Sequence, residues 1–154
     1  MFLYRTQFYI SFSSIPFYLN RAIVITMEKE LRAHGVKITP QRLEIIGKLK
    51  ELGSSHPSFN DVYKAVKDAC PSVSRSTVHE NLKLLVELDI VGTFHYKGEV
   101  HYEMNFEPHV NMVNSSGKIV DIKDDEIKDH LKEIERIVNE KEGIKVKNLM
   151  VLVE

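Results

Sequence analysis

The sequence has little cysteine and no long apolar run. Its 154 residues contain a single cysteine, Cys70, and no tryptophan. A disulfide within the chain and a CxxC metal clip are both impossible, and a reducing, cytoplasmic setting is expected. No stretch reaches the roughly eighteen apolar residues of a membrane-spanning helix. The sequence also lacks an HExxH motif, a glycine-rich phosphate loop and a nucleophile–base pair, so we do not expect an enzyme.

The first 26 residues lack acidic side chains, yet they contain seven of the chain's thirteen Phe and Tyr residues. Their apolar pattern has no clear period. They also make a poor signal peptide, because the apolar core is broken and no A-x-A site follows. We interpret residues 1–26 as an extension that is disordered or lies upstream of the true start at Met27. A peripheral membrane anchor is the alternative.

The net charge of −1 conceals an asymmetry along the chain. Residues 27–97 carry 11 basic and 9 acidic side chains, whereas residues 98–154 carry 8 basic and 13 acidic ones. The first part is therefore mildly basic and the second part acidic. This balance gives weak support for nucleic-acid binding, because committed binders are usually more basic.

After Met27, cap residues and apolar spacing predict four short helices. Gly35 and Gly53 have the position of helix ends, while Thr39, Ser58 and Ser74 have the position of N-caps. Pro40 follows Thr39 and fits a first helical position. The apolar stripe of the second helix contains Leu43, Ile46, Leu49 and Leu52, and that of the third contains Val62, Ala65, Val66 and Ala69. The expected helices span residues 27–35, 39–53, 58–70 and 74–89.

The fourth helix has two different faces. Val78, Leu82 and Leu85 are spaced i, i+4 and i+7, which places them on one buried stripe. The opposite face is rich in small polar and basic side chains, namely Arg75, Ser76, His79, Asn81 and Lys83. Such a face suits hydrogen bonding to DNA. The alternative is the solvated face of a helical bundle.

Directly after this helix the pattern changes to period 2, and "YKGE" predicts the turn of a hairpin. Val100, Tyr102 and Met104 are expected on one face, with His101 and Glu103 on the other. Helices followed by a two-stranded hairpin are the layout of a winged helix, in which the helix before the hairpin enters the major groove. We therefore predict an α+β chain whose residues 27–105 form a winged-helix domain that binds double-stranded DNA.

Residues 106–154 predict a small α/β domain. Strands are expected at 109–113, 118–122 and 144–153, and an amphipathic helix at 124–143. Ile127, Leu131, Ile134 and Val138 share one face of that helix. About 50 residues are too few to cover such a sheet alone. We interpret this region as a dimerisation domain of a homodimer.

Four blocks together resemble the ferric uptake regulator (Fur) family: "HGVKITPQRLEIIGKL", "HPSFNDVYKAV", "PSVSRSTVHENLKLL" and "GKIVDI". The resemblance covers residues 27 to about 154. It implies a homodimeric, metal-responsive transcription regulator, usually a repressor, with a winged helix followed by an α/β dimerisation domain. A regulatory metal at the junction would set the separation of the two DNA-binding domains.

The recognition helix departs from the family pattern. His79 occupies the usual tyrosine position and Glu80 the usual arginine position, so the operator sequence cannot be carried over. Glu80 would either contact a cytosine amino group or lie off the interface. The residues expected to contact DNA are Gln41, Arg42, Arg75, Ser76, Thr77, His79 and Lys83.

The resemblance also concerns metals. The family's structural zinc site of four cysteines is absent, because the first pair would fall within "NMVNSSGK", which has no cysteine. The regulatory ligands match His56, Glu103, His109 and Asp121, while the second histidine of the usual H-x-H pair is Asn111. His101 is a spare candidate. One divalent ion per subunit, Zn, Fe(II) or Mn, is expected.

Two other functions are compatible with the sequence. The first is a winged-helix regulator that no longer responds to metal. The second is a protein-interaction or metal-buffering dimer whose DNA recognition has decayed, which Glu80 and the weak basic charge favour slightly.

Overall fold

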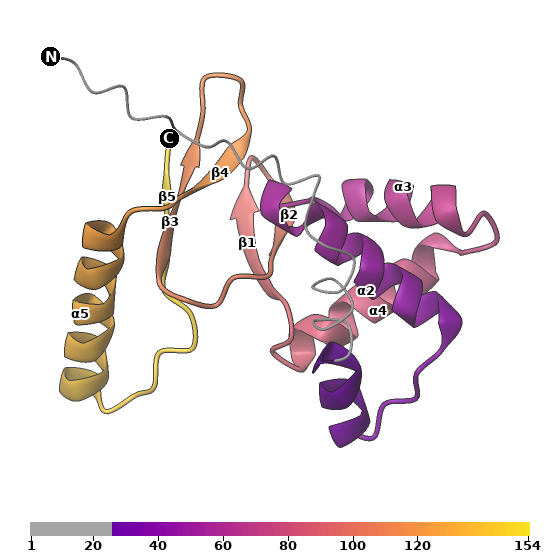
Figure 1. The fold of residues 1–154 in the computed structure, drawn as a ribbon, viewed down its shortest axis with the longest axis horizontal. Coiled ribbons are helices and arrows are strands. Elements are labelled where there is room, and N and C mark those ends of the chain that lie inside the picture. Colours follow the sequence, from indigo (N-terminus) through magenta and orange to yellow (C-terminus); the bar gives the residue numbers. More distant parts are fainter. Residues whose placement is uncertain (1–25) are drawn as a thin grey trace, which may run out of the picture. The chain divides into compact units, whose positions relative to one another are not determined.

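The computed structural model describes residues 26–154 (Figure 1). The chain divides into two compact units between residues 37 and 38. Of the predicted extension, residues 1–25 lie outside the described residues, and Thr26 begins a helix over residues 26–33. Gly35 follows this helix with a φ of +70°, which confirms its predicted place at the helix end. The predicted domain boundary between residues 105 and 106 stays a prediction.

Three helices open the second unit. They are α2 (Pro40–Leu52), α3 (Phe59–Ala69) and α4 (Arg75–Glu87). The three predicted N-caps are confirmed, since the side chains of Thr39, Ser58 and Ser74 each accept a hydrogen bond from a backbone N–H in the first turn. Ser58 and Asp61 form a full capping box. A short 3₁₀ helix, η2 (Gly53–Ser55), joins α2 to the segment that leads into α3.

The helices pack through the stripes that their spacing predicts, with two exceptions. Val78, Leu82 and Leu85 of α4 are buried as expected. In α2, Ile45 is buried beside Ile46 and Leu49, whereas Leu43 is only half-buried. In α3, Val62 and Val66 are buried, whereas Ala65 is half-buried and Ala69, in the last turn, is exposed.

The hairpin after α4 consists of β1 (Gly92–Tyr96) and β2 (Glu99–Glu103), paired antiparallel. Lys97 and Gly98 form its turn with φ of 49° and 79°, as a two-residue type I′ turn requires. The predicted alternation places Tyr102 and Glu103 on opposite faces of β2, and the pairing with β1 is regular through both residues. Both side chains are buried, so both faces of the strand are covered at this end.

The second sheet has the strand order β4-β3-β5. Strand β3 (His109–Val113) pairs antiparallel with β4 (Ile119–Ile122) and parallel with β5 (Met150–Val153). Helix α5 (Asp125–Glu142) connects β4 to β5 and lies along this sheet (Figure 1). The strand predicted over residues 144–153 is therefore shorter, since residues 144–149 form the loop that returns the chain to the sheet.

An apolar cluster joins the hairpin to the second sheet. Phe94 and Tyr96 of β1 pack with Ile119 of β4, and Val113, Met150 and Leu152 cover them. This contact holds the hairpin against the second sheet. No helix within residues 26–154 is long and apolar enough to cross a membrane.

Candidate metal centre and nucleic-acid interface

His56 is fixed by an unusual backbone conformation. It follows η2 with φ 49° and ψ 61°, in the left-handed region that few non-glycine residues adopt. The next residues lie against the hairpin: the Tyr102 N–H donates to the Pro57 carbonyl at 2.9 Å, and Ser58 forms a β-bridge with His101. These contacts place the imidazole of His56 beside the end of β2.

The other three predicted ligands come from strands. Glu103 is the last residue of β2 and His109 the first residue of β3. Asp121 of β4 is paired with Asn111 of β3. Because alternate residues of a strand share a face, His109, Asn111 and Asp121 lie on the same side of the sheet.

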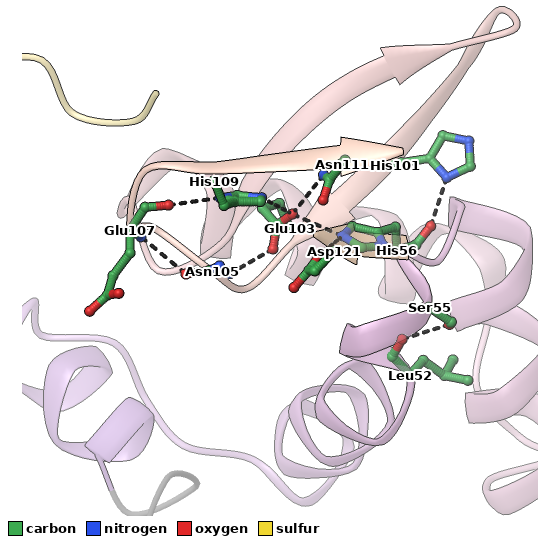
Figure 2. A network of polar contacts seen from close by, with 10 residues as sticks. All are labelled: Leu52, Ser55, His56, His101, Glu103, Asn105, Glu107, His109, Asn111 and Asp121. Atoms are coloured by element: carbon green, nitrogen blue, oxygen red, sulfur yellow. Dashed lines mark hydrogen bonds and ion pairs between the residues drawn. The ribbon is translucent and has the colours of Figure 1, made fainter. Parts of the chain in front are cut away.

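The four side chains converge on one point, with Glu103 at its centre (Figure 2). Glu103 Oε2 lies 3.1 Å from His109 Nε2 and 3.2 Å from His56 Nε2. His56 Nε2 also lies 2.8 Å from Asp121 Oδ1. One ligand atom from each of the four residues falls within 4.8 Å of all the others. The structure therefore brings together all four residues that the sequence predicted for one site.

Hydrogen bonds outside this group set the orientation of two of its members. The backbone carbonyl of Glu107 lies 2.7 Å from His109 Nδ1, and the Asn105 N–H donates to Glu103 Oε1 at 2.6 Å. With Nδ1 protonated, Nε2 of His109 keeps a lone pair directed at the site. Such outer contacts are typical of histidine and carboxylate ligands, because they fix tautomer and ring orientation.

The histidines and carboxylates of this group stabilise one another in their charged forms. Burial opposes the charging of His56, but hydrogen bonds and charges from Asp121 and Glu103 outweigh burial and raise the pKa of His56 to about 9. Burial likewise opposes ionisation of Glu103, yet hydrogen bonds from His109, His56 and the Asn105 N–H hold the pKa of its carboxyl well below its usual range. The same hydrogen bond with Glu103 raises the pKa of His109 against the effect of burial.

The residues present fit a divalent cation. Two imidazole nitrogens and two carboxylates are a donor set that Zn, Fe(II) and Mn accept. Bonds of about 2.1 Å separate tetrahedral ligands by about 3.4 Å, so the observed separations of 2.8–3.2 Å need only a small expansion. Within residues 26–154 no other group of His, Cys, Asp and Glu is arranged in this way.

A cavity of about 230 Å³ offers a route into the group. It is lined by His109 and Asp121 and by further acidic side chains, Glu107, Asp124 and Asp125. Asp121 is also the most exposed of the four, with 26% of its side chain accessible, against 3% for Glu103. A cation entering from this side would meet negative charge first.

His101, the spare candidate, does not join the group. Its Nδ1 lies 2.7 Å from the His56 carbonyl oxygen, and its ring stacks on Phe94. Its role in the structure is to hold the His56 segment against β2. Asn111, by contrast, does join the group: it is fully buried, and its Nδ2 donates to Glu103 Oε2 at 3.3 Å. The spacing of two residues from His109 on one strand was the signal that could have placed it there.

Helix α4 presents the polar face that its sequence predicted. Arg75, Ser76 and Thr77 lie in its first turn; Arg75 and Ser76 are exposed, and Thr77 is half-buried. The guanidinium of Arg75 lies over the rings of Phe59 and Tyr63, 4.6 and 5.1 Å from their centroids, and donates to Asn60 Oδ1 at 2.7 Å. Helix α3 thus holds Arg75 in a fixed position at the start of α4.

The remaining predicted DNA contacts lie near this face. On α4 the side chains of His79 and Lys83 are about 60% exposed, and that of Glu80 is 71% exposed. Gln41 is exposed at the start of α2. The placement of Asn81 on the solvated face is wrong: Asn81 is buried, because it accepts a hydrogen bond from Arg42 Nε at 2.7 Å and donates to the Thr77 carbonyl. Arg42 is thereby fixed to α4.

A family model described as the ferric uptake regulator family matches residues 33–153. The chain belongs to this family. The resemblance drawn from the four sequence blocks is therefore confirmed, and so is the prediction of a DNA-binding transcription regulator that responds to metal. Members of this family are regulators, not enzymes.

Individual relatives are consistent with this family membership. A ferric uptake regulation protein homolog of Archaeoglobus fulgidus is 35% identical over 108 residues, which cover 70% of this chain and 81% of that protein. The peroxide-responsive repressor PerR of Staphylococcus aureus is 32% identical over 109 residues, or 70% of each chain. The ferric uptake regulator of Pseudomonas aeruginosa, solved with manganese, is 30% identical and superimposes with a TM-score of 0.63 over 82% of this chain and 96% of that one. The predicted fold class is confirmed.

The paired charges predict that the metal-free protein loses stability as the pH rises from about 6 to about 9. The folded-state pKa of His56, about 9, exceeds its ordinary value of 6.5, so its contribution is complete below pH 6.5 and disappears as the pH passes through 9. We expect the free energy of unfolding to fall by roughly 1–3 kcal/mol over this range.

Urea unfolding of chelator-treated protein at the two pH values measures this difference. His130→Ala is the matched control, because His130 is exposed on α5 and its replacement should leave the pH dependence unchanged. Equal stability of the metal-free protein at both pH values would contradict the prediction.

Proposed function

We propose that this protein is a homodimeric transcription repressor whose binding to double-stranded DNA depends on one divalent metal ion per subunit. Residues 27–105 would form the DNA-binding winged helix and residues 106–154 the dimerisation domain. His56, Glu103, His109 and Asp121 would hold the ion. The observation that carries the proposal is their convergence from four separate segments, before α3 and in β2, β3 and β4.

The position of these residues links metal binding to DNA binding. His56 lies three residues before α3, the helix that holds Arg75, and Glu103 ends the hairpin. His109 and Asp121 belong to the second sheet. A bound cation would replace the imidazole protons and tie these segments together. A homodimer must place its two recognition helices at half-sites about one helical turn apart, so the angle between the segments decides affinity.

The relatives support the same function. The relative from Staphylococcus aureus is named as a repressor, and the structure from Pseudomonas aeruginosa was solved with manganese. We assign repression to this chain on that basis, with a cytoplasmic location. The DNA contacts proposed on the α4 face are Gln41, Arg42, Arg75, Ser76, Thr77, His79 and Lys83.

A metal-independent regulator is the second candidate, and one observation favours it. The four side chains already pair with each other at 2.8–3.2 Å, so protonated histidines can hold the segments together in place of a cation. In that case the protein would bind DNA equally well with and without chelator.

An electrophoretic shift with the DNA upstream of its own gene tests the function. We expect the chelator-treated protein to bind weakly and added Mn²⁺, Fe²⁺ or Zn²⁺ to raise the affinity at least tenfold. A double variant, His56→Ala with His109→Ala, should not respond to metal and should show no metal uptake by calorimetry. Strong DNA binding by the wild-type protein that chelator does not change would favour the metal-independent regulator. Absence of DNA binding both with metal and with chelator would favour the metal-buffering dimer.

Replacing Arg75 with alanine should weaken DNA binding by about 1–3 kcal/mol. If Arg75 contacts a guanine edge, the loss is largest on the preferred sequence. If it contacts a phosphate, the loss is similar on all sequences and the salt dependence becomes shallower. Fluorescence anisotropy at two salt concentrations distinguishes these results. Arg136→Ala on α5 removes the same charge elsewhere and serves as the control, and unchanged affinity of Arg75→Ala would remove Arg75 from the interface.

The homodimer should form through the second sheet and α5. Ile134 of α5 and Val151 and Val153 of β5 are apolar side chains with 40–47% exposure, which one copy of the chain leaves uncovered. Sedimentation velocity at micromolar concentration should give a dimer, and Ile134→Glu should shift it toward monomer. Lys132→Glu, on the same helix, is the control for added negative charge. A stable, folded wild-type monomer would contradict the prediction.

A further inference from the structure

Asn111 is the one buried member of the metal centre that the four-ligand description leaves out. It lies two residues after His109 on β3, and it is paired directly with Asp121 on β4. The pleat of the sheet therefore directs its side chain to the same face as those of His109 and Asp121. No part of Asn111 is accessible to solvent, so its carboxamide is enclosed beside the proposed ligands (Figure 2).

The two ends of this carboxamide have unequal partners. Nδ2 donates to Glu103 Oε2 across 3.3 Å, which is a long hydrogen bond. Oδ1 is buried and has no hydrogen-bond partner among the described residues. A buried carbonyl-type oxygen without a partner is unfavourable, and native structures usually satisfy it. A cation is a partner that this oxygen can accept, since carboxamide oxygens are ordinary metal ligands.

Glu103 Oε2 is the shared contact that brings the Asn111 carboxamide close to the proposed ligands. The same oxygen faces His109 and His56 at 3.1 and 3.2 Å, so any cation held by these three residues lies next to the carboxamide. The terminal torsion of asparagine is broad and roughly two-fold, so a half-turn about χ2 exchanges Oδ1 and Nδ2 and gives up only the long hydrogen bond to Glu103. Oδ1 would then occupy the end that now contacts Glu103.

We infer that Asn111 is a fifth ligand to the metal proposed above, through Oδ1, and that it shifts the preference of the centre from Zn²⁺ toward Mn²⁺ and Fe²⁺. This inference rests on the proposed metal-dependent function. With Asn111 the donor set has two imidazole nitrogens and three oxygens. Zinc favours four ligands with nitrogen and sulfur donors, whereas manganese favours oxygen donors and higher coordination numbers.

Three variants separate a ligand from a residue that only orients Glu103. Asn111→Leu keeps the branched shape without a polar atom, Asn111→Asp keeps an oxygen, and Asn111→His supplies a nitrogen. Asn81→Leu is the matched control, because it removes another buried carboxamide, in α4 and outside the metal centre. Mn²⁺ and Zn²⁺ affinities are measured by competition titration of purified, chelator-treated protein. Co²⁺ absorption reports coordination number, because the bands are stronger at four-coordinate sites.

We expect Asn111→Leu to lose at least tenfold in Mn²⁺ affinity with less than a threefold change for Zn²⁺, and to gain Co²⁺ absorption. Asn111→Asp should retain Mn²⁺ binding, Asn111→His should favour Zn²⁺, and Asn81→Leu should match the wild type. Urea unfolding shows that each variant is folded; if Asn111→Leu does not fold, the contrast between Asn111→Asp and Asn111→His decides.

Two results would overturn the inference. Equal losses for both ions in Asn111→Leu, with an unchanged Co²⁺ spectrum, would show that Asn111 only donates to Glu103. Unchanged affinities in all three variants would place it outside the centre. Both results leave the proposed function intact, whereas a wild-type protein that binds neither ion removes the metal-dependent function itself.

Discussion

The negative charge of Glu103 is the feature around which the second unit is arranged. Its carboxylate is almost fully buried, and a buried charge is stable only when other groups compensate it closely. The compensation comes from His56, His109 and Asn111, which contact one oxygen, and from the Asn105 N–H, which contacts the other. Three segments of the chain, the one with His56, the end of β2 with Asn105, and β3, must therefore keep their relative positions for Glu103 to remain ionised.

This requirement explains two local features that are otherwise unfavourable. His56 adopts a left-handed backbone conformation, and such a conformation persists only where the surrounding structure imposes it. Here the bridge between Ser58 and His101 and the hydrogen bond from His101 to the His56 carbonyl fix the segment. The second feature is the burial of Glu103 at the end of β2, where His56 and His109 contact its carboxylate.

The same group has two ways of neutralising its charges. Without metal, protonation of the histidines balances Glu103 and Asp121, which is why the pKa of His56 is raised to about 9. A bound cation would take the place of those protons, so metal affinity and pH would be linked. The face proposed to contact DNA is arranged independently of this group: Arg75 lies over the rings of Phe59 and Tyr63, and Arg42 donates a hydrogen bond to Asn81. These two arginine side chains would therefore lose little conformational freedom on binding.

The sequence by itself determined the helices, their caps, the hairpin and the family. These features depend on local rules: Ser58 and Ser74 cap the helices that follow them, and Val78, Leu82 and Leu85 recur at the helical period. The four residues of the candidate metal site were predicted too, but through the family's blocks and not through any spacing in this chain.

Only the tertiary structure decided which polar side chains enter the interior. Asn81 was placed on the polar face of its helix, yet it is buried, because Arg42, far away in the sequence, donates a hydrogen bond to it. Asn111 was known only as a departure from the family's histidine pair, and the structure shows it buried against Glu103. His101 and Glu103 were predicted on one strand face, but only Glu103 joins the group of four. His101 contacts the His56 carbonyl, next to its bridge with Ser58. Local periodicity carries no information about such contacts, since they depend on how the hairpin and the second sheet meet.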